Sequence, residues 1–266
     1  MQRLCWFSEQ KEDFSVLLFV NQPSIAMTRK NEIHPNDKIA EAIISNPFLM
    51  LLLEHFEIQI PVHDLKIRQL CEINGINEEL FIAFAKLYNG SRSISELKLS
   101  EDDALSIVRF LRASHSFYSD QIYPEIMELI EQMKKLNDHK EMKLVSLFFS
   151  DYFNEVTEHL DYENQVFHPY VMHLAENLKG KRHNLAENYS TDDYKDHHDD
   201  IEEKLNDLRN LLVKYLPVKG DYKVRRKLLF LLSELEYDLK IHSDIEELIL
   251  IPLTVRLEKK LKNSDR

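Results

Sequence analysis

One stretch of the chain carries an uninterrupted helical pattern, LLFLLSELEYDLKIHSDIEELILIPL (residues 228–253). Apolar side chains recur in it at intervals of three or four, so they lie along one stripe of an amphipathic helix that faces a core. His242 and Glu246 interrupt this stripe one helical turn apart. Burying an imidazole and a carboxylate is costly unless something pairs with them. Either a metal ion shared with neighbouring helices or a local hydrogen bond would satisfy both groups.

The composition favours an all-helical protein. The chain has 266 residues, enough for one large or two small domains, with only 4 glycines and 8 prolines. A net charge of -12 argues against nonspecific binding to nucleic acid or to an anionic membrane. Two cysteines, Cys5 and Cys71, exclude a disulfide framework and a cysteine-based zinc site. No apolar run approaches the ~20 residues of a membrane span, and the expected location is the cytoplasm.

Three parts of the chain differ in pattern. Residues 1–26 show no helical period and are predicted to be a disordered extension, a candidate for upstream sequence translated from a misassigned start. Residues 27–95 carry short amphipathic patterns typical of a small helical N-terminal domain. Residues 96–266 carry four long patterns, and the polar stretch GSRSISELKLS (90–100) is the predicted linker between the two helical parts.

The N-terminal patterns predict one amphipathic helix from Ile39 to Leu52, with Asn36 or Asp37 as its N-cap. Two shorter helices are predicted over 65–74 and 77–88, with Gly75 between them at a C-cap position.

This pair of short helices has the spacing of a helix-turn-helix around residues 70–77. Its second helix begins with Glu78 and Glu79 where a DNA reader would present basic side chains. A helical hairpin that packs on its own apolar residues is therefore the preferred interpretation.

The four long patterns are separated near residue 138, across 179–190 and at 217–220. A capping box at Ser100 and Asp103 begins the first pattern. Pro124 lies inside that pattern and predicts a kink. Short connections between long amphipathic helices make neighbours antiparallel, so we predict an all-α, up-down-up-down four-helix bundle preceded by the small helical domain.

Each of the four long patterns has an apolar seam that a histidine interrupts. The second seam continues to Val166 and Tyr170, and the third continues to Leu212 and Tyr215. At ~1.5 Å per residue, His115 and the midpoint of His159 and Glu163 lie at the same distance from the turn near residue 138. Across the final turn, the distances of His198 and of the midpoint of His242 and Glu246 differ by roughly 9 Å. The seam histidines are His115, His159, His198 and His242, and the carboxylates Glu163 and Glu246 follow the second and the fourth by one turn.

Any single seam histidine is more often a hydrogen-bonded core residue than a ligand. The six polar side chains lie at similar heights along the predicted helices, and each needs a polar partner when it is buried. A metal centre that all six share would provide that partner. The His-x3-Glu spacing alone is weak, since His183/Glu187 in a loop and His198/Glu202 also have it.

The remaining histidines are predicted to lie outside the centre. His168 is expected on the side of its helix opposite to His159, and His173 lies ~21 Å along the axis from it. His197 is adjacent to His198 in sequence, and the choice between them stays open.

Four imidazoles and two carboxylates suit iron, manganese or zinc, because no thiolate is present to favour soft ions. Carboxylates from two different helices are the means by which helical bundles bridge a pair of metals. Such a pair keeps positions for an oxo group, water or a diatomic ligand. The Glu-x-x-His spacing of ferritin-like proteins does not occur on these seams.

These motifs resemble the hemerythrin-like di-iron proteins for repair of iron centres, also described as regulators of cell morphogenesis and nitric oxide signalling. The resemblance covers most of residues 36–266. It is carried by Arg112-Ala113-Ser114-His115 with Tyr123-Pro124, by His159-x3-Glu163 before Phe167 and Pro169, by His198-Asp199-Asp200, and by Asp238-Leu239-Lys240-Ile241-His242-x3-Glu246 with Pro252.

The resemblance implies a pair of iron ions, bridged by an oxo or hydroxo group, with manganese or zinc as substitutes. The family's N-terminal Cys-Cys pair has no counterpart near residues 57–61, so the chain would belong to a divergent branch. The implied iron ligands are His115, His159, His198 and His242, with Glu163 and Glu246 bridging.

The implied function is a cytoplasmic stress response in which iron donation or nitric oxide chemistry aids the repair of damaged iron-sulfur clusters. Its partners would be O2 or NO and damaged iron-sulfur proteins, without membrane or nucleic acid. An alternative is a sensor that binds O2 or NO and signals through the N-terminal helical module. A third is a structural helical protein without metal.

Overall fold

The computed structural model describes residues 32–137, 140–181, 183, 189–195, 203–217 and 220–264. Within these ranges the regular structure is helical without β-strands, apart from an isolated antiparallel bridge between Lys38 and Lys66. The prediction of an all-α protein is therefore confirmed. Residues 31–266 form one compact unit. Residues 1–26, the predicted extension, lie outside the described residues.

The first four helices are short. They are α1 (Ile39–Ser45), α2 (Leu49–His55), α3 (Ile67–Asn74) and α4 (Glu78–Tyr88).

The single helix predicted over 39–52 is wrong, because the chain breaks between α1 and α2 at Asn46 and Pro47. A residue before proline is pushed out of the helical region, and Asn46 is extended with φ -138° and ψ 95°. The predicted cap is also wrong. Lys38 occupies the N-cap, while the Asp37 carboxylate accepts a hydrogen bond from the backbone N–H of His34.

The helical hairpin of α3 and α4 follows the sequence prediction. Gly75 ends α3 in the left-handed region, with φ 63°, where glycine pays no steric cost. The Asn77 side chain caps α4 by accepting a hydrogen bond from the backbone N–H of Glu79. Helices α3 and α4 contact each other, and they bury Leu70, Phe81 and other apolar side chains.

Four groups of helices follow, and each contains one π-helical turn, labelled η, among its described residues. The first is α5 (Glu101–Phe117), η1 (Tyr118–Ile122) and α6 (Tyr123–Leu136). The second is α7 (Lys140–Tyr162), η2 (Glu163–Phe167) and α8 (His168–Leu178). The third contains α9 (Thr191–Lys195), α10 (Glu203–Asn210) and η3 (Leu211–Tyr215). The fourth is α11 (Tyr222–Ile245), η4 (Glu246–Leu250) and α12 (Ile251–Ser264).

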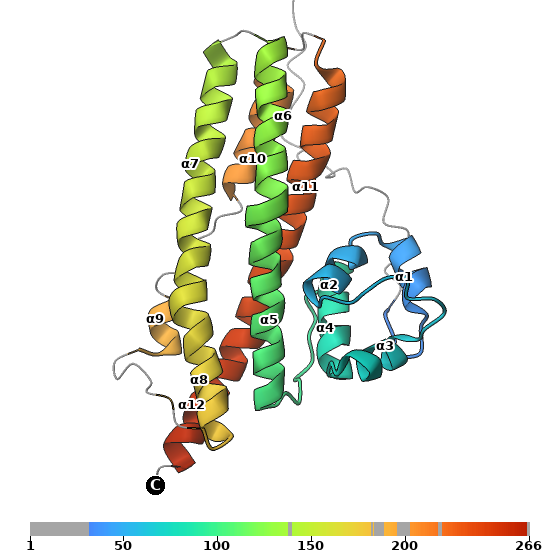
Figure 1. Ribbon diagram of the computed structural model, residues 1–266, viewed down its shortest axis with the longest axis vertical. Coiled ribbons are helices and arrows are strands. Elements are labelled where there is room, and N and C mark those ends of the chain that lie inside the picture. The colour runs from blue at the N-terminus through green and yellow to red at the C-terminus, as the bar shows by residue number, and fades with distance from the viewer. Residues whose placement is uncertain are drawn as a thin grey trace, which may run out of the picture. The chain divides into compact units, whose positions relative to one another are not determined.

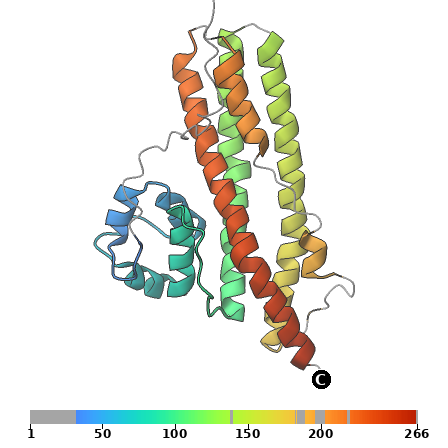
Figure 2. The ribbon, with the colours of Figure 1, turned by 180° about the vertical axis from the view of Figure 1, so that it is seen from behind.

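The long segments pack along one another. Helix α6 contacts α7 and α11, and α10 also contacts both α7 and α11. Toward the other ends of the segments, α8 contacts α5 and α12. Figures 1 and 2 show the segments α5–α6, α7–α8 and α11–α12 side by side from opposite directions. The capping box predicted at Ser100 and Asp103 begins α5 and is confirmed.

Every π-helical turn in the described ranges ends two residues before a proline. Proline has no N–H and its ring clashes with the carbonyl four residues earlier, so the regular α-helical ladder cannot pass through it. A π turn accommodates one extra residue at such a point and rotates everything after it by about 100° relative to an unbroken helix. The four prolines are Pro124, Pro169, Pro217 and Pro252.

This rotation corrects two of the predicted seams. Val166 was expected in the core, but it is half-buried, while Phe167 and His168 behind it are buried. Tyr215 was expected in the core and is 72% exposed, while Leu216 is buried. In both cases an unbroken helical period was carried through a π turn.

Arg225 fixes the connection between η3 and α11. Its guanidinium is buried, and it donates hydrogen bonds to the Asp221 carboxylate and to the carbonyl oxygens of Leu212, Leu216 and Pro217. Asp221 is the N-cap residue of α11, but its side chain binds Arg225 and makes no cap hydrogen bond.

We expect Arg225→Lys to lower the free energy of unfolding by about 3 kcal/mol, because one ammonium cannot satisfy a carboxylate and three carbonyls that a planar guanidinium reaches. Urea unfolding followed by circular dichroism measures this. Arg226→Lys, at an exposed position next to it, is the control and should cost less than about 0.5 kcal/mol. Equal losses in the two variants would contradict the role of Arg225.

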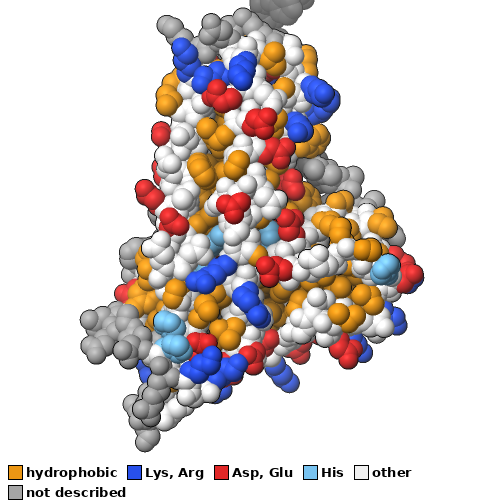
Figure 3. All heavy atoms as spheres, viewed as in Figure 1, with side chains coloured by type: hydrophobic (Ala, Val, Ile, Leu, Met, Phe, Trp, Pro, Cys, Tyr) orange, Lys and Arg blue, Asp and Glu red, His pale blue; other side chains and the backbone are white. Residues whose placement is uncertain are grey.

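The surface of this unit carries charges of both signs. On the face seen in Figure 3, acidic and basic side chains are interspersed, and histidine contributes only small patches. Among the described residues, no helix combines the length and the apolar character needed to cross a membrane.

Candidate metal centre

The structure brings five of the six predicted ligands together from three helical segments. His115 comes from α5 and His242 from α11, while Glu163 and Glu246 are the first residues of η2 and η4. His159 lies on α7, one turn before Glu163. Four of these side chains are buried, and the His159 side chain is 12% exposed. His198, the sixth, lies outside the described residues, as do His197 and Glu202.

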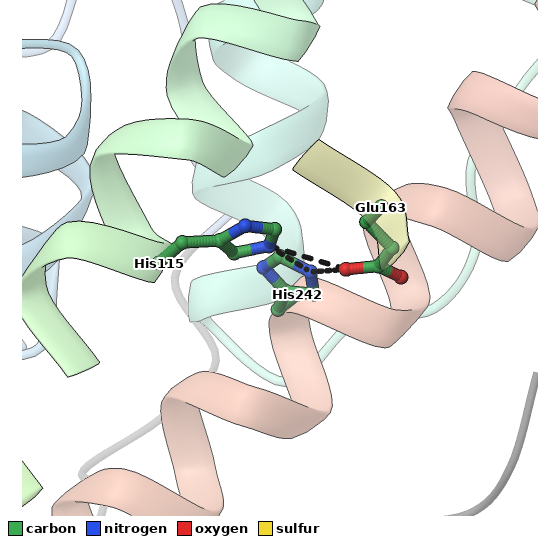
Figure 4. A group of neighbouring side chains, drawn as sticks. All are labelled: His115, Glu163 and His242. Atoms are coloured by element: carbon green, nitrogen blue, oxygen red, sulfur yellow. Dashed lines mark hydrogen bonds and ion pairs between the residues drawn. The ribbon is translucent and has the colours of Figure 1, made fainter. Parts of the chain in front are cut away.

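Three of these residues form the centre of the cluster. One ligand atom each of His115, Glu163 and His242 lies within 4.8 Å of the other two. The Nε2 atom of His115 is 3.2 Å from Oε2 of Glu163 and 3.3 Å from Nε2 of His242. Figure 4 shows the two imidazoles and the carboxylate pointing toward one another from three different elements.

His159 and Glu246 extend the cluster on either side. Nε2 of His159 lies 3.0 Å from the second oxygen of Glu163, Oε1. Nε2 of His242 lies 3.6 Å from Oε1 of Glu246. Glu163 therefore has histidines at both of its oxygens, and His242 lies between the two carboxylates.

These separations suit a metal ion. Two donor atoms that each lie ~2.1 Å from one ion, at an angle of about 90–110°, are roughly 3.0–3.4 Å apart. The distances from His115 to Glu163 and to His242 fall in this range. Imidazoles and carboxylates together are a donor set for iron, manganese or zinc. The residues present thus fit the ions that the sequence pattern predicts.

The charge states of the metal-free site also fit. Burial by itself raises the pKa of Glu163, but hydrogen bonds to His115, His159 and His242 outweigh it and hold that pKa well below its usual range. Burial lowers the pKa of His115, and the Glu163 contact only partly offsets this. Near neutral pH the site therefore contains an ionised carboxylate beside a neutral imidazole, the two forms that bind metals.

His242 is the exception. Burial acts to lower its pKa, but the charges and hydrogen bonds of Glu246 and Glu163 raise it to about 10. Near neutral pH His242 therefore holds a second proton, on a ring whose Nε2 lies 3.6 Å from Glu246 and 3.9 Å from Glu163. A metal ion that binds this histidine must displace that proton.

Ser114 determines which nitrogen of His242 faces the centre. Its hydroxyl donates to the backbone carbonyl of Leu111 at 2.7 Å and lies 3.0 Å from Nδ1 of His242. Since the hydroxyl has one proton and gives it to Leu111, it accepts from Nδ1–H. Nε2 then faces His115 and Glu163, as a metal ligand oriented by an outer hydrogen bond would.

Tyr194 is a member of the site that sequence reasoning missed. Its hydroxyl donates to Oε1 of Glu163 at 2.6 Å and also interacts with Glu246, and its ring stacks on Phe167 at 3.7 Å. A signal for it existed, because Tyr194 lies four residues before His198 and continues the third seam backward. The Tyr194 hydroxyl therefore links the carboxylates of Glu163 and Glu246.

Asp238 is a second missed residue, one turn before His242 on α11. Its buried carboxylate accepts hydrogen bonds from Tyr88 at 2.5 Å and Tyr118 at 2.9 Å, and it lies 2.8 Å from Nε2 of His55. His55 and Tyr88 belong to the N-terminal helices α2 and α4, and the Tyr118 ring contacts His242. The network therefore joins the N-terminal helices to the candidate site.

His168 corrects the sequence prediction. It was expected on the side away from His159, but it is fully buried and its ring stacks on His115, with centroids 5.3 Å apart. The π turn η2 lies between His159 and His168 and rotates the later residue into the core. His173 and His183 do lie outside the cluster, where their rings stack on each other at 4.7 Å.

Comparisons of this chain with protein-family models, curated proteins and solved structures give no match. The assignment of the site therefore rests on its own donor atoms and on the spacing of its motifs.

Proposed function

We propose that this chain is a non-haem di-iron protein of the stress response. The observation that carries the proposal is the buried cluster of His115, His159, Glu163, His242 and Glu246, whose donor atoms approach one another to between 3.0 and 3.9 Å. A core that needed only stability would fill this space with apolar side chains, because burying ionisable groups is costly.

The fold that accompanies this function is a hemerythrin-like, up-down-up-down four-helix bundle. The contacts of α6 with α7 and α11, and of α10 with the same two helices, support it, because they form a closed ring of four neighbours. The four segments would then surround the centre, and His198 of the third would be its sixth ligand.

Different residues of the protein would have different roles at this centre. His115, His159 and His242 would hold the ions through neutral nitrogens, and Glu163 and Glu246 would bridge them and offset their charge. Ser114 orients His242, and Tyr194 orients Glu163. Two iron ions, when bound, would supply positions for a diatomic ligand and iron that can be passed on.

The biological role follows from the motif resemblance to the repair-of-iron-centres proteins. In this role the chain meets oxidants or nitric oxide and helps to restore damaged iron-sulfur clusters, by donating iron or by reacting with NO. The ligand residues are buried, so bulk water would be excluded from the metal centre. Such a centre suits reactions with small uncharged molecules such as O2 or NO. Transfer of iron from the loaded protein to an iron-sulfur protein that lacks its cluster is the direct assay of this role.

The first test is the metal content of the purified protein. We expect about two irons per chain in the wild type and loss of most of this metal in His159→Ala and in His242→Ala, since each variant loses a ligand. His173→Ala, on α8 outside the cluster, should keep the wild-type content. A wild-type protein that takes up no metal would leave the metal-free structural interpretation in place.

A second candidate function is an O2 or NO sensor that signals through the N-terminal helices. The Asp238 network favours it, because His55 of α2 and Tyr88 of α4 meet the carboxylate that lies one turn from His242. A structural change at the centre could reach these helices through the hydrogen bonds of Asp238. A change in protein or DNA binding when the loaded protein is exposed to NO would favour the sensor over the repair protein.

A further inference from the structure

The side chain of His168 occupies an unusual position for a histidine. It is 0% exposed, and neither ring nitrogen has a hydrogen-bond partner among the described residues. Leaving buried polar atoms unpaired costs about 1–3 kcal/mol each. A leucine or phenylalanine would fill the same volume without this cost.

The neighbours of the His168 side chain are residues of the candidate centre. Its ring lies nearly parallel to that of His115, at 22° and 5.3 Å, and the His115 ring is in turn 4.9 Å from that of His242. Three imidazoles thus form a continuous group. Burial, with His115 second, lowers the pKa of His168 to about 3, while Glu163 and Glu246 act in the opposite sense. The imidazole is therefore neutral near pH 7 and lies within the field of both carboxylates.

The local backbone explains how the ring reaches this place. The π turn η2 begins at Glu163 and ends at Phe167, directly before His168. Without its extra residue, His168 would face away from His159, and the turn rotates it by about 100°. The same turn therefore presents a carboxylate at one end and an imidazole just beyond the other.

We propose that His168 is a further ligand of the metal centre and adds an imidazole beside His115. This inference rests on the proposed metal binding and deepens it, because an added neutral nitrogen donor changes which metal the site prefers. Imidazole suits iron and zinc, whereas carboxylate and water suit manganese. His168 would therefore favour iron over manganese.

The test compares full-length wild type with His168→Phe and His173→Phe in anaerobic titrations with Fe(II) alone and with Mn(II) alone. Phenylalanine keeps an aromatic ring against His115 and removes the two nitrogens. We expect His168→Phe to weaken iron binding by at least about tenfold and manganese binding by less. Without metal, its unfolding temperature should equal or exceed that of the wild type. His173→Phe should change neither affinity.

A second measurement uses the wild type and does not depend on how the variant folds. In protein labelled with 15N at histidine, one ring nitrogen of His168 should shift on addition of Zn(II), while those of His173 should not. An unshifted His168, or iron affinity in His168→Phe equal to that of the wild type, would overturn the inference. A wild type that binds none of these metals would overturn the proposed function itself, which is a different result.

Discussion

Glu163→Gln should lose nearly all bound metal, and more than any single histidine variant loses. The Glu163 carboxylate has His159 at Oε1 and His115 and His242 toward Oε2, so it is the residue that two ions would share. Glutamine keeps the size and one oxygen, but it removes the negative charge and the second acceptor. The loss of affinity should exceed the ~10–100-fold that removing an outer hydrogen-bond partner of a ligand causes.

The metal-free form of Glu163→Gln should remain folded. Tyr194 can still donate to the amide oxygen, and His242 can release the proton that Glu163 helps to hold. The destabilisation should therefore stay below the about 3–5 kcal/mol that an uncompensated buried charge costs.

Metal content by elemental analysis and urea unfolding of the metal-free protein measure the two effects separately. Glu158→Gln, at an exposed position on α7, is the matched control and should match the wild type in both. Wild-type metal content in Glu163→Gln would show that this carboxylate is not a ligand.

The sequence was sufficient to predict that the chain is helical and to predict five of the polar side chains that cluster in its core. Helical periodicity alone placed His115, His159 and His242 on apolar stripes, and the structure brings their side chains together. The reason is physical. A stripe of apolar residues must face the core, and polar residues on that stripe face it too.

The π turns explain most of what periodicity missed. Counting at 100° per residue fails after an extra residue, so Val166 and Tyr215 were placed inside and His168 outside. Proline two residues beyond each turn was a signal in the sequence, since an α-helical ladder cannot continue through it. The break at Pro47 had the same signal.

Other features depend on contacts that no local pattern contains. Asp238 lies four residues before His242, which a helical reading can detect, but its partners are 150 and 183 positions away in sequence at Tyr88 and His55. Only the packing of the N-terminal helices against α11 reveals that this carboxylate is buried and paired.

Asp238→Asn should lower the free energy of unfolding by about 3–5 kcal/mol, the range for breaking a buried charged network. The carboxylate accepts from Tyr88 and Tyr118 and meets Nε2 of His55. Asparagine offers one oxygen and turns an NH2 group toward donors, so at least one of the three partners is left unpaired. Asp244→Asn is the control on the same helix. Its partner Arg92 is 57% exposed, so the loss should be about 0–1 kcal/mol.

The stability difference between wild type and Asp238→Asn should also depend on pH, which a simple loss of packing would not cause. Burial acts to raise the pKa of Asp238, but the charge of His55 and hydrogen bonds from His55, Tyr88 and Tyr118 outweigh it, and the folded pKa lies below the ordinary 3.8. Stability from such a group is fully present above the unfolded pKa and is lost as the pH falls through the folded one. The difference between wild type and Asp238→Asn in urea unfolding should therefore be constant above about pH 5 and shrink below about pH 4. A difference that stays the same down to pH 3 would mean that Asp238 is not ionised in the folded protein. The network would then hold the N-terminal helices to α11 through neutral hydrogen bonds alone, and each of its tyrosines replaced by phenylalanine would cost about as much as the aspartate.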